Sequence, residues 1–139
     1  MTKKLLSGVF ACLAFIPCVA LADALAVTVK GMKAGEGNLR IAVFDEAHRN
    51  GFPDGKYLHG VEVPATEEEM TVEISNVEGG KYSIAVIQDL NENQKLDKFL
   101  GIPSEPYGFS GKWKSGAASF EDALIDTDKD GFSTVITLR

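Results

Sequence analysis

The chain has 139 residues, a length that fits one small domain, and a formal net charge of −6 at pH 7. This acidic balance argues against nucleic acid or an anionic membrane surface as a partner, because both attract basic proteins. Its two cysteines, Cys12 and Cys18, both lie within the first 22 residues. A chain that loses this segment has no disulfide, no thiol nucleophile and no thiolate metal site.

The first residues have the pattern of a signal peptide. Two lysines precede a long apolar run, and the small residues Ala20 and Ala22 occupy the −3 and −1 positions of a cleavage site. A membrane anchor is disfavoured, because the run is short for a span and polar Asp23 follows it. We therefore predict a signal peptide at residues 1–22 and a single exported domain at residues 23–139, periplasmic or secreted and without a membrane span. Loss of the two lysines takes the formal charge from −6 to −8.

Alternation of apolar and polar residues predicts short β-strands throughout the exported part. Residues 25–44 are expected to form a hairpin around a glycine-containing turn. The strand at 82–87 is apolar on both faces, which predicts a central position in a sheet. Residues 120–138 are expected to form a final strand pair joined by a turn. The expected strands cover residues 25–30, 39–44, 57–63, 70–74, 82–87, 120–127 and 133–138.

These strands predict an all-β fold, an antiparallel, immunoglobulin-like β-sandwich of about seven strands. One long loop is expected between the central strand and the last strand pair, and one helical turn near residues 46–49. The alternation also assigns a set of side chains to the core: Val27, Val29, Ile41, Val43, Val72, Ile74, Ile84, Val86 and Phe120.

The long loop begins with side-chain oxygens on alternate residues. Asp89, Asn91, Asn93 and Asp97 match positions 1, 3, 5 and 9 of an EF-hand-type loop. Lys95, at position 7, offers its backbone carbonyl. Since Ca²⁺ binds six to eight oxygens at close range, this spacing predicts a calcium site.

Two residues depart from the EF-hand pattern. Gln94 stands where glycine makes the sharp turn, and Leu100 stands where a bidentate glutamate closes the cage. Glu105 can replace the missing acid if the segment GIPSEP folds back. The alternative interpretation is an Asn/Asp-rich turn that satisfies its own backbone without a metal.

Aromatic residues gather after this loop. Tyr107 and Trp113 are candidates for ligand contact, because aromatic rings on a loop stack on sugar rings or hold a peptide. Phe109, between them, is expected to close one open end of the core.

Catalytic patterns are sparse. His48 and His59 are the only histidines, and both are expected at exposed loop or strand-edge positions. The alternating aspartates 126, 128 and 130 precede Gly131 and predict a hairpin turn, because no closing acid follows for a cation site. We therefore expect no enzyme activity. A hydrolase that uses the loop acids stays open as an alternative.

Several segments together resemble an uncharacterised family of secreted bacterial proteins, catalogued as domain of unknown function 2141. They are DLNENQKLD, GIPSEPYGFS, GGKYSIAVIQD, SFEDALI, VTVKGM, LRIAVFD and GFPDG. The resemblance implies a small exported β-sandwich and implies no enzyme activity. This chain has Gln88-Asp89 where the family usually has His-Asp, and Gln94 where the family usually has glycine.

The leading hypothesis is an exported, non-enzymatic module whose calcium-held loop presents a surface to an envelope or extracellular protein or to a glycan. The second is a structural or interaction protein of the envelope in which hydrogen bonds alone order the loop. The predicted metal ligands are Asp89, Asn91, Asn93, Lys95, Asp97 and Glu105, and the candidate contact residues are Tyr107 and Trp113.

Overall fold

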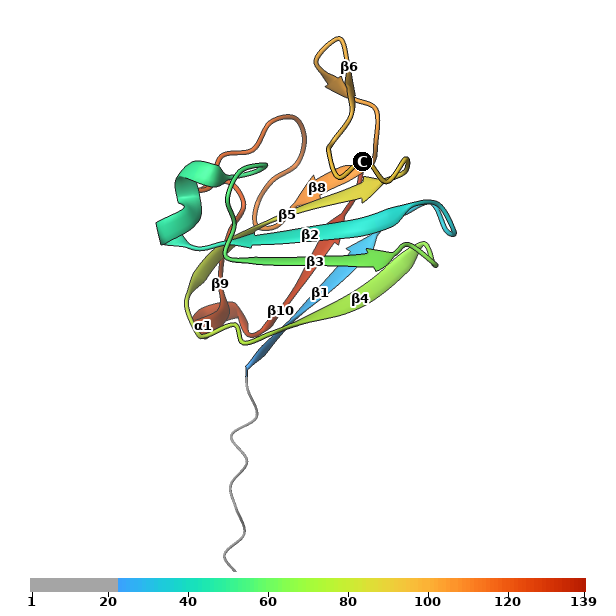
Figure 1. Ribbon diagram of the computed structural model, residues 1–139. Coiled ribbons are helices and arrows are strands. Elements are labelled where there is room, and N and C mark those ends of the chain that lie inside the picture. Colours follow the sequence, from blue (N-terminus) through green and yellow to red (C-terminus); the bar gives the residue numbers. More distant parts are fainter. Residues whose placement is uncertain (1–22) are drawn as a thin grey trace, which may run out of the picture.

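The computed structural model describes residues 23–139, so the predicted signal peptide lies outside the described residues. Two β-sheets pack against each other, and the all-β sandwich that the alternation predicts is confirmed (Figure 1). The elements are β1 (Ala24–Lys30), β2 (Asn38–Phe44), η1 (a 3-10 helix, Glu46–Gly51), β3 (His59–Pro64), β4 (Glu69–Ser75), β5 (Lys81–Asp89), β6 (Lys98–Phe99), β7 (Ile102–Pro103), β8 (Tyr107–Phe109), β9 (Leu124–Asp126), α1 (Thr127–Asp130) and β10 (Ser133–Thr137).

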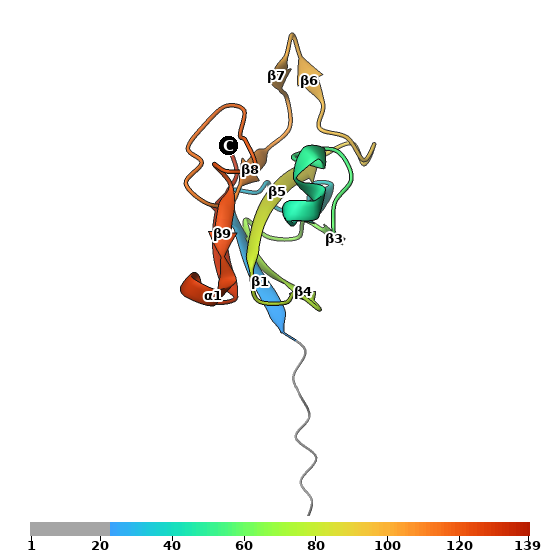
Figure 2. The ribbon, with the colours of Figure 1, turned by 90° about the vertical axis from the view of Figure 1, so that its left-hand side faces the viewer.

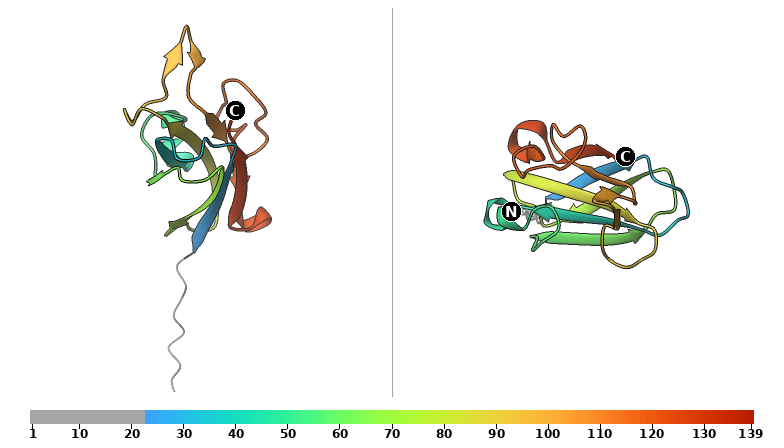
Figure 3. Two further views of the ribbon diagram at one scale, coloured as in Figure 1. Left: turned by 90° about the vertical axis from the view of Figure 1, so that its right-hand side faces the viewer. Right: turned by 90° about the horizontal axis from the view of Figure 1, so that it is seen from above.

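One sheet has three strands in the order β10-β1-β4. The other has the order β3-β2-β5-β8, and β9 also pairs with β5. Seen from above, β3, β2 and β5 lie side by side (Figure 3). Pairing is antiparallel except between β1 and β10, which run parallel. Three short strands, β6, β7 and β8, fall inside the predicted long loop, so residues 23–139 contain more strands than predicted.

The predicted hairpin at residues 25–44 is wrong, because β1 and β2 belong to different sheets. β1 pairs with β4 and β2 pairs with β5. The connection between them crosses from one layer to the other, and the buried side chain of Gln88 holds it. Gln88 accepts a hydrogen bond from the Lys33 backbone N–H (2.8 Å) and donates to the carbonyls of Lys33 and Glu36 (both 2.7 Å). The turn-forming residues between β1 and β2 therefore form a crossover between the two sheets and not a hairpin turn.

The predicted final strand pair is also wrong. β9 joins the five-stranded sheet beside β5, whereas β10 joins the other sheet beside β1. The aspartate run between them forms the short helix α1 instead of a hairpin turn, with Asp126 as its N-cap. Buried Thr127 anchors this helix through hydrogen bonds with the backbone of Gly80. Residues 120–123 precede β9 and are outside it.

All nine predicted core residues are buried, so this prediction is confirmed. Most of them pack between the two sheets. Phe120 instead belongs to a smaller cluster with Phe44 and Ala85, against which Phe52 and Phe109 pack. Because Phe109 pairs with Ala85 across neighbouring strands, it projects on the same side as Ala85. Phe109 therefore packs against this smaller cluster, on the face of β5 that carries Ala85.

Helix η1 carries a pH-sensitive cap. Asp45 accepts a hydrogen bond from the backbone N–H of His48 (3.0 Å), and the His48 Nδ1 lies 2.5 Å from the same carboxylate oxygen. Partial burial acts to raise the pKa of Asp45, but the contacts with His48 outweigh it, and the pKa is lowered.

We expect the Asp45 cap to make stability depend on pH. A lowered folded-state pKa means that the stabilisation is present above the unfolded pKa, about 3.9, and is lost as the pH falls through the folded-state pKa. Asp45→Asn should flatten this acid limb of a plot of unfolding free energy against pH. The exposed Asp54→Asn is the control. An acid limb that Asp45→Asn leaves unchanged would contradict the assignment.

Candidate functional site

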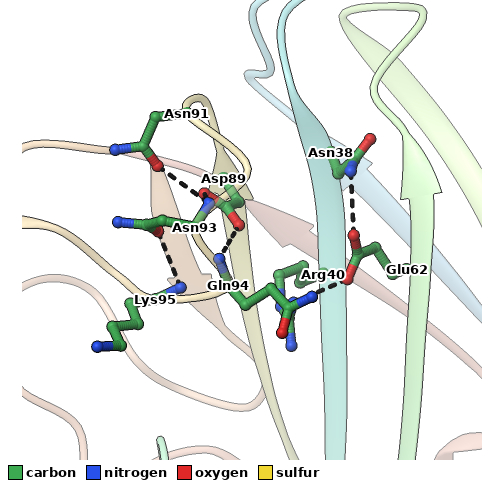
Figure 4. A network of polar contacts seen from close by, with 8 residues as sticks. All are labelled: Asn38, Arg40, Glu62, Asp89, Asn91, Asn93, Gln94 and Lys95. Carbon is green, nitrogen blue, oxygen red and sulfur yellow. Dashed lines mark hydrogen bonds and ion pairs between the residues drawn. The ribbon is translucent and has the colours of Figure 1, made fainter.

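The loop at residues 89–105 starts from a buried carboxylate at the end of β5. Asp89 is fully buried, and its two oxygens accept hydrogen bonds from the backbone N–H groups of Asn93 (3.2 Å) and Gln94 (2.6 Å) (Figure 4). The chain therefore turns around this side chain. Asp89 holds the loop to the sheet.

The two asparagines continue this turn. Their side-chain oxygens accept hydrogen bonds from backbone N–H groups two residues ahead, at Asn93 (3.3 Å) and Lys95 (3.0 Å). Their amide nitrogens both donate to Asp97, at 2.5 Å from Asn91 and 2.7 Å from Asn93. Four of the predicted metal ligands thus lie together, and hydrogen bonds connect them.

The loop makes its sharp turn without glycine. Gln94 has φ of 65° and Glu92 has φ of 56°, both in the left-handed region that favours glycine. Gln94 therefore adopts a positive φ at the position where an EF-hand loop has glycine. Its side chain is exposed, so the residue meets no packing conflict there.

The condition for Glu105 is met, because the chain folds back. Strands β6 and β7 form a hairpin that projects beyond the sandwich (Figure 2). Buried Glu105 returns to the base of the loop, where it accepts hydrogen bonds from the backbone N–H groups of Leu90 and Asp97 (both 3.0 Å). Leu100 lies at the hairpin tip with 86% of its surface exposed, away from the acids.

The loop has the oxygen chemistry of a hard-cation site, with its oxygens engaged by N–H groups. Asp89, Asp97 and Glu105 take no part in the ion pairs of the described residues. Within residues 23–139, no group of three or more His, Cys, Asp or Glu side chains is arranged around a common metal position. Lys95 is exposed.

A cleft of about 570 Å³ lies on the outer face of the five-stranded sheet, beside this loop. Its floor is one row of cross-strand neighbours, in which Ala42 pairs with Gly60 on one side and with Ala85 on the other. Side chains of neighbouring strands at one register position project on the same face. Three small residues in a row therefore leave a trough, which Phe109 closes at one end.

The next row of the sheet adds polar groups. Arg40 and Glu62 form an ion pair (2.7 Å), and Ile87 and Tyr107 continue the row. All four residues line the cleft.

Two loops form the walls of the cleft. The 89–105 loop contributes Gln94, Lys95, Leu96 and Lys98, and the segment after η1 contributes Pro53, Asp54, Gly55 and Tyr57. The Tyr57 ring lies against Gly60 so closely that a Cβ at position 60 would be 2.5 Å from its Cε2. A side chain at position 60 would therefore push the exposed Tyr57 ring aside.

Of the two predicted aromatic contact residues, Tyr107 and Trp113, one lines the cleft and the other does not. Tyr107 lines the cleft, but Trp113 packs behind it, with ring centroids 5.6 Å from Tyr107 and 5.1 Å from Phe109. Arg139 covers the Trp113 ring at 5.8 Å. Sequence reasoning missed Tyr57 and the floor residues. Strand alternation signals only that Arg40 and Ala42 face outward.

Fold and site together define a small β-sandwich with a loop-walled cleft on the face of one sheet. A family model described as "Uncharacterized protein conserved in bacteria (DUF2141)" matches residues 27–134, so the chain belongs to this family. The resemblance found in the sequence is thereby confirmed. No curated protein and no solved structure gave a significant match. Within residues 23–139, no helix is long and apolar enough to cross a membrane.

Proposed function

We propose that this protein is an exported, non-enzymatic binding module, in which the 89–105 loop is stabilised by Ca²⁺ and forms one wall of a ligand cleft. One observation carries the proposal. Residues of this loop line a cleft of about 570 Å³ together with the outer face of the sheet. That volume lies within the range of small-molecule sites, roughly 300–1,000 Å³.

The chemistry of the loop favours a hard cation. Asp89, Asp97 and Glu105 bring three carboxylates to one loop, and Asn91 and Asn93 direct their carboxamides at Asp97. A half-turn of these two carboxamides would present oxygens in place of nitrogens, the ligand atoms that Ca²⁺ requires. With few formal charges, the expected Kd is on the order of 10⁻⁴ to 10⁻³ M, as in extracellular modules.

A metal-free interaction protein is the second candidate, and the hydrogen bonds of the loop favour it. Both oxygens of Asp89, of Asp97 and of Glu105 already accept N–H groups. A loop satisfied in this way needs no cation to be ordered.

The non-enzymatic part of the proposal has two supports. The loop acids accept backbone or amide N–H groups, a structural task for a carboxylate. The residues that line the cleft include neither histidine. Export rests on the signal-peptide pattern of residues 1–22, and periplasmic or secreted location follows from it.

Calcium is expected to raise the thermal midpoint of the exported protein. At a Kd of about 10⁻⁴ M, about 10 mM calcium should add about 2.7 kcal/mol to the free energy of unfolding. Magnesium should do less, because its small octahedral shell fits a flexible loop poorly. Asp97→Asn should abolish the calcium effect, and backbone NMR signals of Gln94, Lys95 and Leu96 should move with calcium in the wild type only.

The matched control is Asp128→Asn, which alters the other alternating aspartate run. A calcium shift that Asp128→Asn removes and Asp97→Asn keeps would move the ion to α1. A wild-type midpoint that stays constant at millimolar calcium would establish the metal-free candidate instead.

A further inference from the structure

We infer that the cleft beside the 89–105 loop is a saccharide site, an inference that rests on the proposed binding function. The decisive feature is that the cleft is amphipathic. Its floor is a row of small apolar residues, and its rim carries both hydrogen-bond donors and acceptors. A sugar ring has the same two characters, with C–H faces and hydroxyl edges.

The floor suits the face of a ring. Gly60, Ala42 and Ala85 form a row of small side chains across three adjacent strands, and Ile87 borders it. The aromatic residues stand at the two sides. Tyr57 presses on Gly60 yet keeps 45% of its surface exposed, which leaves ring surface available for stacking.

The opposite aromatic residue, Tyr107, belongs to a cluster of three aromatic rings. Tyr107 contacts Phe109 (5.9 Å) and Trp113 (5.6 Å), these two rings also contact each other (5.1 Å), and the Arg139 guanidinium lies over the Trp113 ring. A ring that already packs against two other rings loses little conformational entropy when a ligand stacks on it. Trp113 thus supports Tyr107 without lining the cleft.

The rim suits hydroxyl groups. Sugar hydroxyls both donate and accept, and vicinal pairs fit planar groups with two parallel donors or acceptors. The cleft offers the donors Arg40, Lys95 and Lys98 and the acceptors Asp54 and Glu62, with the Gln94 amide as both. Figure 4 shows the Arg40–Glu62 pair beside the turn that carries Gln94.

Other ligand classes fit this lining less well. An extended peptide gains affinity from backbone pairing. The cleft lies over β2 and β5, whose backbones are bonded to strands on both edges. A polyanion is disfavoured because Glu62 already neutralises Arg40, and Asp54 lies on the opposite wall. A purely apolar ligand would cover the Arg40–Glu62 pair and the Gln94 amide without forming hydrogen bonds to them.

The test is an NMR titration of the calcium-loaded exported protein with the neutral oligosaccharides cellotetraose and chitotetraose as separate probes. At least one probe should shift amide signals of the floor and both walls. Tyr57→Ala, which removes a stacking ring, and Ala42→Leu, which fills the trough, should each weaken binding by about tenfold or more. Ile102→Ala, at the exposed hairpin tip, is the control and should leave the affinity unchanged.

Three outcomes would overturn the inference: no probe shifts the cleft, the shifts map to the hairpin tip, or Tyr57→Ala and Ala42→Leu bind as the wild type does. A pool of short peptides is titrated in parallel. Peptide shifts in the cleft without saccharide shifts would refute the ligand class and leave the binding module intact. Loss of the calcium effect on the loop, with saccharide binding retained, would refute only the metal part of the proposed function.

Discussion

Val86→Asp is expected to unfold this protein. Val86 lies in the middle of β5, is 1% exposed, and faces the core between the two sheets. The five-stranded sheet is built around β5, so a carboxylate at this position has no water and no cationic partner among the core residues. An uncompensated buried charge costs several kcal/mol, a large share of the about 5–15 kcal/mol that holds a domain together.

The matched control for this change is Val135→Asp. Val135 lies on β10 with 59% of its surface exposed, so a carboxylate there stays hydrated. Far-ultraviolet circular dichroism and denaturant titration of both variants give the comparison. We expect Val135→Asp to melt cooperatively close to the wild type. A cooperative β-rich transition in Val86→Asp would mean that position 86 is not part of a packed core.

Strand positions and core faces were predictable because burial leaves a local trace. In β1 and β2 every second side chain faces the opposite sheet, so alternation marks the residues that are inside, whereas the continuous apolar run of β5 marks a strand that is buried on both faces. Alternation carries no information about which strand lies beside which. Residues 31–37 look like a hairpin turn, yet they connect the two sheets. Gln88 bonds to this connection, and β1 pairs with β10 in the three-stranded sheet.

The candidate site divides in the same way. The acids and amides of the 89–105 loop lie close in the chain, so their spacing predicts that they meet, and they do. The fold-back of Glu105 depends on the β6–β7 hairpin, whose turn places Leu100 at φ of 51°. Leucine rarely adopts this conformation, so the sequence does not predict the turn.

The sequence contains no comparable signal for the cleft. Its floor consists of an alanine, a glycine and another alanine from three strands, residues that carry no chemical signal of their own. They become a site only through register, which brings Gly60, Ala42 and Ala85 into one row. The walls come from two loops that are far apart in the chain. Sites of this kind require the pairing of strands to be known first.

Gln88→Leu is expected to cost about 2–4 kcal/mol of unfolding free energy. Leucine is similar in size, so the change removes hydrogen bonds and leaves little empty space. The side chain of Gln88 is fully buried and serves three backbone groups of the crossover between the sheets, two at Lys33 and one at Glu36. Each of these groups loses its partner in the variant, and a hydrogen bond contributes a net of about 0.5–1.5 kcal/mol, so three lost bonds account for the expected cost.

The matched control is Gln94→Leu, the same replacement at an exposed residue. Gln94 bonds to Asp89 through its backbone N–H, which the replacement keeps. Urea titrations at constant m-value give the difference, and Gln94→Leu should stay within about 0.5 kcal/mol of the wild type. Gln88→Glu adds a second comparison, since it keeps the acceptor for Lys33 N–H but loses both donors and buries a charge. If Gln88→Leu costs no more than Gln94→Leu, the three bonds contribute no net stability, and packing alone directs the chain from one sheet to the other.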